Sequence, residues 1–439
     1  MHQLRHWLHR RLRPKRFALL DELLHTQSLS RQEVLQKQQD DLADMIAYAT
    51  RNTAFYADRF APLLHHDEPP PLSALPILSK ADVRGRLDDL LANGLERSQV
   101  KVGHTGGSTG QPLAFWYDDV KHELMRAGMC RSYMMSGWQP GEKILNFWGA
   151  RQDTRIGGVF GTGWTDFIAA EKTIAAFEYT ERQMLEWATL VRGYRPVLLQ
   201  GYASVLAEFA RFVIETRQAM PATLRGVYST AEVLGSWQRE LIERAFGCKV
   251  FNQYGSREIP NIACECRHGR MHVFTDMVYL EALEECTGTA PGRLLVTSLT
   301  NRLMPFIRYD IGDSGRMLAG EANHCDCGSP FPLMEMGMCR HNDIIRTQNG
   351  KRIHPSYFNR LLAHLPQIKQ YQCIQSSRDK LTLDIVAATA LPAAVTADLR
   401  TRIARDIDEQ MVVEINCVDE IHRSASGKHR YVISHCANT

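Results

Sequence analysis

A glycine-rich loop carries the densest group of chemically useful side chains in the sequence. It reads His104-Thr-Gly-Gly-Ser-Thr-Gly-Gln-Pro112, with three glycines and four hydroxyl or imidazole side chains in nine residues. Glycines let a backbone approach a ligand closely, and backbone N–H groups with the hydroxyls of Thr105, Ser108 and Thr109 can donate to phosphate oxygens. The loop lacks the Gly-Lys-Ser/Thr ending of a Walker A motif, and Gly/Ser/Thr clusters are also common in plain loops. Polyphosphate binding is one interpretation and an ordinary loop is the other.

A second group of residues offers soft metal ligands. Two Cys-x-Cys pairs, Cys264 with Cys266 and Cys325 with Cys327, accompany His272, and a glycine follows each pair. The best tetrahedral set for Zn²⁺ is Cys266, His272, Cys325 and Cys327, with Cys264 as a substitute. Four protein ligands leave no open position, so this zinc would be structural. The spacing is tighter than the common Cys-x-x-Cys knuckle, and unpaired buried thiols remain the alternative.

The polar turns of the middle region predict which elements position this chemistry. Short apolar runs alternate with helical stretches at residues 143–148, 196–200, 224–228 and 249–253. This alternation predicts a parallel α/β arrangement. Three of the runs end in Gly201-Tyr-Ala-Ser204, Ser229-Thr-Ala-Glu232 and Tyr254-Gly-Ser-Arg-Glu258. Ligands bind beyond the carboxyl ends of strands in open α/β sheets, so we expect these turns to face one cleft.

Composition sets the class of protein. The 439 residues are 44% hydrophobic and 23% charged, which is typical of a globular protein and excludes collagen, coiled coils and low-complexity chains. The 52 Lys and Arg against 49 Asp and Glu give a net charge of +3, which argues against nucleic-acid binding. No run of about 18 uncharged apolar residues predicts a membrane span. Eleven cysteines, an odd number, suit a reducing cytoplasm.

The first 16 residues hold six Lys or Arg and no acid, but lack the apolar core and cleavage site of a secretory signal. One helical face carries Leu4, Trp7, Leu8 and Leu12, and the rest carries Arg5, His9, Arg10 and Arg13. Such a helix can lie on a membrane surface or pack on its own domain. Because Pro14 cuts the segment short, we favour the packed helix. Further helices are predicted after Ser30, which forms a capping box with Glu33, and after Ser79.

The order of the motifs resembles that of the adenylate-forming ligases, in the branch of phenylacetate-CoA ligases and CapK-like proteins. Six segments match the family's motifs in order: Thr105–Pro112, Ser229–Glu232, Tyr254–Glu258, Arg308-Tyr-Asp-Ile-Gly-Asp313, Arg340-His-Asn-Asp343 and Ser426-Gly-Lys428. They extend over residues 104 to 428, and their joint occurrence by chance is implausible.

The resemblance implies roles for these residues. Lys428, Glu258 and Thr109 would be catalytic, with Lys428 as a point charge on the reacting phosphate and Glu258 as a hard ligand for Mg²⁺. Asp313 would bind the ribose hydroxyls, and Tyr254 would offer an aromatic face to adenine. The implied ATP and AMP contacts are Thr105, Gly106, Gly107, Ser108, Thr109, Gly110, Thr230, Ala231, Glu232, Tyr254, Gly255, Ser256, Asp313 and Arg340.

The sequence departs from the family pattern at two positions. Thr230-Ala231 replaces a common Gly-Ala pair, and His341-Asn342 stand beside Asp343 where the hinge of the family is acidic. Neither change removes a charge that the chemistry requires. Asp343 would still serve as the pivot between domains.

These observations predict an α/β protein with a large domain at residues 1–339 and a small mobile α+β lid at 340–439. Within the large domain we expect a helical lead-in at 1–95, an α/β core at 96–262 and a β-rich part with the zinc clip at 263–339. The implied reaction converts a carboxylate and ATP, with Mg²⁺, into acyl-AMP and pyrophosphate, and then passes the acyl group to coenzyme A.

Two alternatives to this function remain. The first is a synthetase that passes the acyl group to an amine or a carrier, for example in polysaccharide or natural-product tailoring. The second is a zinc-stapled nucleic-acid-binding protein, which the near-neutral charge disfavours. We expect a cytoplasmic enzyme without a membrane span or a nucleic-acid partner, and the sequence leaves a homodimer open.

Overall fold

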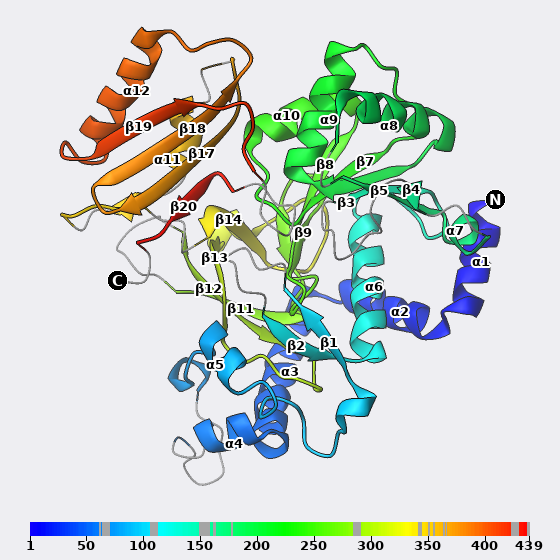
Figure 1. The fold of residues 1–439 in the computed structure, drawn as a ribbon. Coiled ribbons are helices and arrows are strands. Elements are labelled where there is room, and N and C mark those ends of the chain that lie inside the picture. Colours follow the sequence, from blue (N-terminus) through cyan, green and yellow to red (C-terminus); the bar gives the residue numbers. More distant parts are fainter. Residues whose placement is uncertain are drawn as a thin grey trace.

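The computed structural model describes residues 1–60, 63, 71–105, 113–148, 159–160, 164–176, 179–283, 291–340, 345–349, 352–353, 356–362, 365, 367–422 and 430–436. Several predicted site residues lie outside this part of the chain: Gly106, Gly107, Ser108, Thr109, Gly110, Asp343 and Lys428. The molecule consists of a large α/β body and a C-terminal α+β unit, as the sequence predicts (Figure 1).

Helices form the lead-in. They are α1 (His2–Leu12), α2 (Pro14–Gln27), α3 (Arg31–Asn52), α4 (Ala54–Phe60) and α5 (Lys80–Gly85), with short 3₁₀ turns at Leu72–Ala74 and Arg97–Gln99. The predicted capping box is present at α3, where Ser30 and Glu33 bond each other's backbone N–H groups. Ser79 and Asp82 cap α5 in the same way. Among the described helices, none has both the length and the apolar character needed to cross a bilayer.

One half of the central sheet is parallel, which confirms the prediction. It contains β3 (Ile144–Trp148), β5 (Glu171–Ala175), β6 (Leu198–Tyr202), β7 (Gly226–Thr230) and β8 (Lys249–Tyr254), with β4 (Val159–Phe160) antiparallel to β5 at the edge. Four of these strands coincide with the four apolar runs of the sequence. The side chains of β3, β6 and β7 are buried on both faces, as expected for parallel strands covered by helices.

Helices cover the two faces of this half. The helices of one face are α8 (Glu181–Tyr194), α9 (Ala203–Glu215) and α10 (Ser236–Phe246), which share a core with β3 and β5 to β8. The other face meets α6 (Asp119–Met134), whose Tyr133 ring lies 4.9 Å from the ring of Tyr228 on β7. Short α7 (Trp164–Ala169) precedes β5 and packs against α1.

The other half of the sheet is antiparallel and comes from the part at residues 263–339 that the sequence predicts to be β-rich. It continues through β9 (Ala263–Glu265), β10 (Met271–Val273), β14 (Leu333–Arg340), β13 (Tyr309–Met317), β12 (Gly292–Ser298) and β11 (Val278–Leu283), with a 3₁₀ turn at Gly320–Asn323. The full order is β11-β12-β13-β14-β10-β9-β8-β7-β6-β3-β5-β4. A separate hairpin of β1 (Lys101–His104) and β2 (Ala114–Tyr117) carries the glycine-rich loop.

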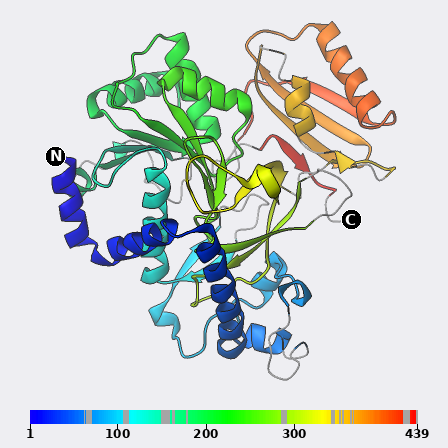
Figure 2. The ribbon, with the colours of Figure 1, turned by 180° about the vertical axis from the view of Figure 1, so that it is seen from behind.

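The C-terminal unit has its own sheet and core. Its elements are β15 (Ile345–Arg346), β16 (Arg352–Ile353), α11 (Ser356–Leu362), β17 (Ile368–Ser377), β18 (Lys380–Ala387), α12 (Ala393–Asp406), β19 (Val412–Cys417) and β20 (Val432–Ser434). The sheet order is β19-β18-β17-β20. Contacts with the body include Gln238 Nε2 donating to the Tyr431 hydroxyl at 3.0 Å and Gln370 Nε2 donating to Glu208 at 2.6 Å. The unit lies beside the α8–α10 layer in both views (Figures 1 and 2).

Candidate active site

The turns that follow β6, β7 and β8 meet at one edge of the sheet. Tyr202 at the end of β6 lies opposite Thr230 at the end of β7. The backbone N–H of Ser204 donates to Glu232 at 2.8 Å, which links the turns after β6 and β7. The Thr230 hydroxyl donates to Gln253 Oε1 on β8 at 2.8 Å. The expectation that these polar turns share one edge is therefore confirmed.

Two backbone features shape this edge. Ala231 has a φ of 69°, a left-handed conformation that costs a residue other than glycine on the order of 1–3 kcal/mol. Ala231 directly follows Thr230, and Thr230 is the residue of this pair that differs from the Gly-Ala of the family pattern. At the next turn, a Cβ on Gly255 would lie 2.9 Å from the backbone nitrogen of Asn261, so a side chain does not fit. Ser256 closes the turn by accepting from the N–H of Ile259 at 3.0 Å.

Tyr254 and Asp313 are in contact although three strands separate β8 from β13 in the sheet. The Tyr254 hydroxyl donates to Asp313 Oδ2 at 3.1 Å. The backbone of Arg340 on β14 lies opposite that of Asp313 on β13 in the antiparallel register. Tyr254 as a whole is 8% exposed. In this arrangement Tyr254 positions the carboxylate of Asp313, and stacking of adenine on Tyr254 would require more of the ring to be exposed.

Glu258 is buried at 4% exposure and held by two residues that sequence analysis did not identify. The Tyr309 hydroxyl donates to Glu258 Oε1 at 3.0 Å, and Lys121 Nζ donates to the backbone oxygen of Glu258 at 2.7 Å. Burial lowers the pKa of Lys121 to about 8, against the opposing effect of Glu258 and Asp118. Tyr309 belongs to the Arg308–Asp313 motif, so it could have been found, whereas nothing in the sequence marks a lysine in the first turn of α6.

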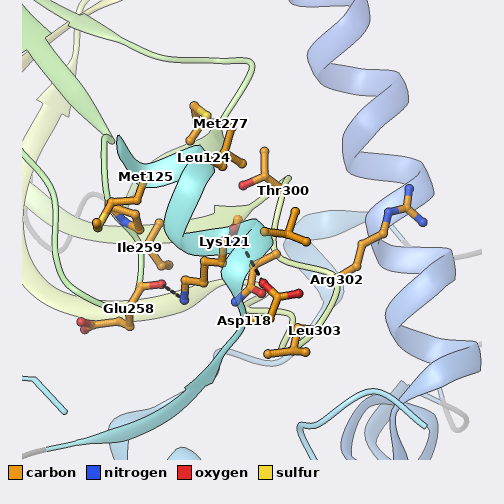
Figure 3. A pocket seen from close by; sticks show the side chains of 14 residues that line it. Asp118, Lys121, Leu124, Met125, Glu258, Ile259, Met277, Thr300, Arg302 and Leu303 are labelled. Carbon is orange, nitrogen blue, oxygen red and sulfur yellow. Dashed lines mark hydrogen bonds between the residues drawn. The ribbon is translucent and has the colours of Figure 1, made fainter. Parts of the chain in front are cut away.

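A pocket of about 200 Å³ lies next to Glu258 (Figure 3). It lies between the start of α6 and the segment after β12, with Lys121 and Glu258 on one wall and Met277, Thr300 and Arg302 across from them. The pocket is mixed in character, because apolar side chains line it together with these charged groups. Its volume matches a small organic group rather than a nucleotide.

The base of the glycine-rich loop lies beside the Tyr254–Glu258 turn. Thr105 closes its base, since the Thr105 N–H donates to the Leu113 carbonyl and the Leu113 N–H donates to the Thr105 hydroxyl, both at 2.9 Å. Arg257 Nη1 donates to the carbonyl of His104 at 3.2 Å. The base of the loop and the Tyr254–Glu258 turn are thereby fixed next to each other.

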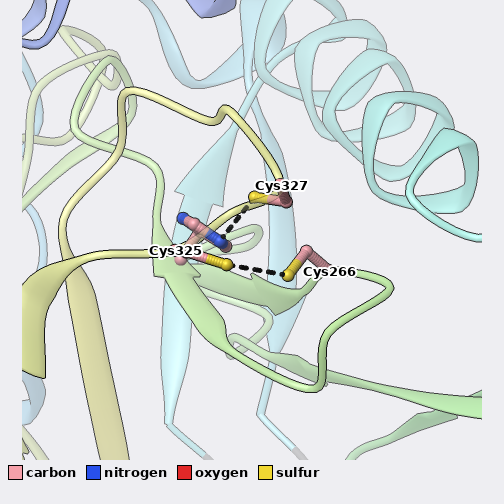
Figure 4. A group of neighbouring side chains, drawn as sticks. Cys266, Cys325 and Cys327 are labelled. Carbon is pink, nitrogen blue, oxygen red and sulfur yellow. Dashed lines mark hydrogen bonds between the residues drawn. The ribbon is translucent and has the colours of Figure 1, made fainter.

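The four predicted metal ligands converge on one point (Figure 4). Their ligand atoms lie within 4.8 Å of one another, with Cys266 Sγ 3.6 Å from Cys325 Sγ and Cys327 Sγ 3.2 Å from His272 Nε2. Cys264 lies outside this cluster, because its sulfur is 3.2 Å from the Tyr228 hydroxyl in the core. Residues two apart on a strand share a face, so Cys264 and Cys266 would point the same way if both were on β9. Cys266 instead lies in the turn beyond β9, and its side chain is free to point toward the cluster.

The surroundings of the cluster suit a bound cation. His272 Nδ1 lies 3.0 Å from the carbonyl of Phe331, which orients the ring with Nε2 toward the cysteines. The backbone N–H groups of His268 and Ser329 donate to Cys266 and Cys327, both at 3.4 Å. Burial raises the pKa of Cys266, but hydrogen bonds from His272 and the neighbouring backbone outweigh it and lower this pKa to about 6. Burial dominates at Cys327 and raises its pKa.

Aromatic residues near the sheet edge belong to the core. Phe147 is fully buried against Trp187 and Phe209, with ring centroids 5.4 and 5.2 Å away. Tyr202 is 2% exposed and packs against Trp148. These contacts place Phe147 and Tyr202 in the packed core.

Comparisons with known proteins show which proteins this chain is similar to. The family model of the CapK C-terminal domain matches residues 345–435. Phenylacetate-coenzyme A ligase from Thermus thermophilus is 26% identical and covers 93% of this chain and 98% of its own length. The Escherichia coli enzyme of the same name is 28% identical over 68% of this chain and 70% of its own. Protein CapK from Staphylococcus aureus is 26% identical over about half of each chain, at 55% and 53%.

The fold is that of solved acyl-CoA ligases. The crystal structure of 2-hydroxyisobutyryl-CoA ligase in its postadenylation state superimposes with a TM-score of 0.70 at 18% identity, covering 94% of this chain and 91% of that one. Fold, ordered motifs and relatives define the class of protein as an adenylate-forming ligase. Within that class, the chain is similar to phenylacetate-CoA ligases over most of its length and to CapK over about half of it, and the CapK C-terminal model matches its last domain.

Proposed function

We propose that this enzyme activates a carboxylic acid as acyl-AMP and then transfers the acyl group to coenzyme A. The observation that carries the proposal is the convergence of Tyr254, Glu258 and Asp313. They come from two separate motifs and lie at one sheet edge, where the Tyr254 hydroxyl donates a hydrogen bond to Asp313. The base of the glycine-rich loop lies beside Glu258, because Arg257 donates to the carbonyl of His104. A nucleotide binds across such an edge.

In the first half-reaction, a carboxylate oxygen of the substrate forms a bond to the α-phosphorus of ATP. The bond from that phosphorus to the α–β bridging oxygen breaks, and pyrophosphate leaves. Charge accumulates on the phosphates, so catalysis depends on positioning and fixed positive charge. Lys428 supplies that charge, Thr109 and its neighbours at 105–110 hold the phosphates, and Asp313 accepts from the ribose hydroxyls.

Glu258 is the protein ligand for Mg²⁺ in this proposal. Its carboxylate is a hard oxygen donor, and the Tyr309 hydroxyl at 3.0 Å fixes its orientation, which fits such a role. When bound, Mg²⁺ neutralises charge on the phosphates. Lys121 holds the backbone of the same residue, so the turn keeps its shape while substrates exchange.

The second half-reaction depends on the division into a body at residues 1–339 and a lid at 340–439. Rotation about Asp343 withdraws Lys428 and brings the Gly350 region to the cleft. The sulfur of the acceptor thiol then bonds to the acyl carbon, the bond from that carbon to the AMP oxygen breaks, and the thiol proton passes to solvent. AMP and the thioester are the products.

The acceptor has a second candidate. The lid forms the surface that meets the acceptor, so transfer to an amine, a hydroxyl or a carrier thiol is the alternative to transfer to coenzyme A. Preformed acyl-AMP can be mixed with coenzyme A, with an amine or with a carrier thiol. If only the amine or the carrier discharges the adenylate, that acceptor takes the place of coenzyme A in the proposal.

We also propose that Cys266, His272, Cys325 and Cys327 bind one structural Zn²⁺. The ion would link the β9–β10 hairpin to the segment before β14. Its four protein ligands would leave no coordination position open, so its role would be structural. The described cysteines form no disulfide, which suits a reducing cytoplasm.

A panel of aryl, alkyl and amino acids tests the proposed activity through carboxylate-dependent exchange of pyrophosphate into ATP. The proposal expects exchange with at least one acid and expects AMP as the nucleotide product. Formation of ADP and phosphate across the whole panel would show that the enzyme does not adenylate. Tyr254→Phe should weaken nucleotide binding because Asp313 loses a hydrogen-bond donor, whereas Tyr117→Phe, on the neighbouring hairpin, is the matched control.

A further inference from the structure

Helix α1 packs on the body with its polar side. Arg5 is 7% exposed, and its guanidinium lies 4.9 Å from the ring centroid of Phe167 on α7. His9 Nε2 lies 2.7 Å from the carbonyl of Ile168. A Cβ on Gly141 would lie 2.3 Å from the backbone oxygen of His2, so the helix backbone touches the body directly. The helix is therefore fixed in place through arginine and histidine side chains.

The rest of the α1 surface carries apolar side chains that are exposed to solvent. Leu4, Trp7 and Leu12 are 60%, 50% and 60% exposed. Eleven large apolar side chains are exposed in the part of the chain that the structure describes, and four of them, these three with Met1, belong to α1 and its N-cap. An ordinary surface helix has the reverse orientation, with apolar residues against the core. Concentrated exposed apolar area of this kind marks an interaction surface.

The charged residues of α1 itself and of the segment up to residue 16 are all basic. Residues 1–16 contain six Lys or Arg and no Asp or Glu. Arg11 lies over the Trp7 ring at 4.4 Å, and Arg13 and Lys15 are exposed at the end of the helix. Arg10 pairs with Asp21 on α2. A second copy of this helix would bring like charges together, whereas an anionic surface would complement them.

The helix lies at an outer edge of the molecule. In both ribbon views α1 is on the side opposite the C-terminal unit (Figures 1 and 2). A flat surface that takes up the apolar face of α1 would therefore leave the C-terminal unit free to rotate.

We propose that α1 docks the enzyme on an anionic phospholipid membrane, with Leu4, Trp7 and Leu12 inserted at the headgroup level and Arg11, Arg13 and Lys15 against lipid phosphates. Amphipathic helices that lie in the membrane plane combine these features. Tryptophan favours the interface, and arginine next to it adds attraction to anionic headgroups. The enzyme would then work at a membrane surface without spanning the bilayer.

Co-sedimentation of the full chain with vesicles tests the proposal. Vesicles of phosphatidylcholine with about one third phosphatidylglycerol should bind the protein, at least about tenfold more tightly than phosphatidylcholine alone, and added salt should weaken the binding. Combined Leu4→Ser, Trp7→Ser and Leu12→Ser should reduce binding at least about tenfold. Combined Arg11→Gln, Arg13→Gln and Lys15→Gln should reduce it by roughly a hundredfold, at about fivefold per charge.

Leu185→Ser is the matched control, since this leucine is similarly exposed on α8, outside the patch, and should leave binding unchanged. The charge variant alters exposed side chains and keeps the test decisive if the serine variant is poorly folded. Equal binding to neutral and anionic vesicles, or no binding, would overturn the proposal. A dimer in solution that the serine variant dissociates, without vesicle binding, would overturn it in favour of an interface between copies.

Discussion

Replacing Cys325 by serine tests the zinc site, because the separations of its ligands match a tetrahedral ion. Zn–S bonds of about 2.3 Å at tetrahedral angles place two sulfurs ~3.8 Å apart, and a Zn–N bond of about 2.0–2.1 Å places sulfur and nitrogen ~3.6 Å apart. The structure has 3.6 Å between Cys266 and Cys325 and 3.2 Å between Cys327 and His272. These two separations lie within a few tenths of an ångström of the tetrahedral values, and the other pairs, all within 4.8 Å, would have to close by about 1 Å or less to admit the ion.

The expected loss of stability follows from binding linkage. An ion present at about 1,000 times its dissociation constant adds ~4 kcal/mol to the free energy of unfolding. Unfolding entropy of about 2.1 cal/mol/K per residue gives ~0.9 kcal/mol/K for 439 residues that unfold as one unit. Cys325→Ser should therefore lower Tm by about 4–5 °C, while correctly folded enzyme keeps most of its rate.

Metal analysis and thermal unfolding of protein purified without chelator measure both effects. Wild type should contain about one zinc per chain, and Cys325→Ser should contain much less. Cys264→Ser is the matched control, since its sulfur lies outside the cluster and its replacement should retain the metal. Wild type without metal, or Cys325→Ser with full metal and an unchanged Tm, would show that the four residues are free thiols.

Three further variants test the active site. Lys428→Ala should lose about a hundredfold or more of pyrophosphate exchange, because it deletes the charge on the reacting phosphate, and near-normal exchange would refute its role. Asp343→Pro should spare exchange but slow acyl transfer, since proline resists rotation of φ, and equal loss of both steps would contradict a hinge. Tyr309→Phe should raise the Mg²⁺ requirement about tenfold by releasing the Glu258 carboxylate. An Mg²⁺ titration that matches wild type would exclude that positioning role.

Local patterns predicted the parts of the fold that depend on local physics. The runs at β3, β6 and β7 are buried on both faces, so their continuous apolar character identified them as parallel strands. The caps at Ser30 and Ser79 were predicted because the groups that bond are three residues apart.

Contacts distant in sequence were beyond this reasoning. Tyr309 and Glu258 are 51 residues apart, and Lys121 and Glu258 are 137 apart, so periodicity carries no trace of either contact. The metal set was predictable despite its span because cysteine and histidine are uncommon and chemically distinct. Helix α1 shows the limit most clearly. Its packing on the body was expected, but its apolar face points outward, and the sequence pattern is the same for either orientation.

Transfer of ¹⁸O from a labelled carboxylate substrate into AMP tests the central claim most directly. Attack of the carboxylate on the α-phosphorus leaves one substrate oxygen on AMP once the acyl group has been transferred. We expect one labelled oxygen per AMP, detected by mass spectrometry after a single turnover with the acid that supports exchange. Unlabelled AMP, or label in inorganic phosphate together with ADP, would contradict acyl-AMP formation.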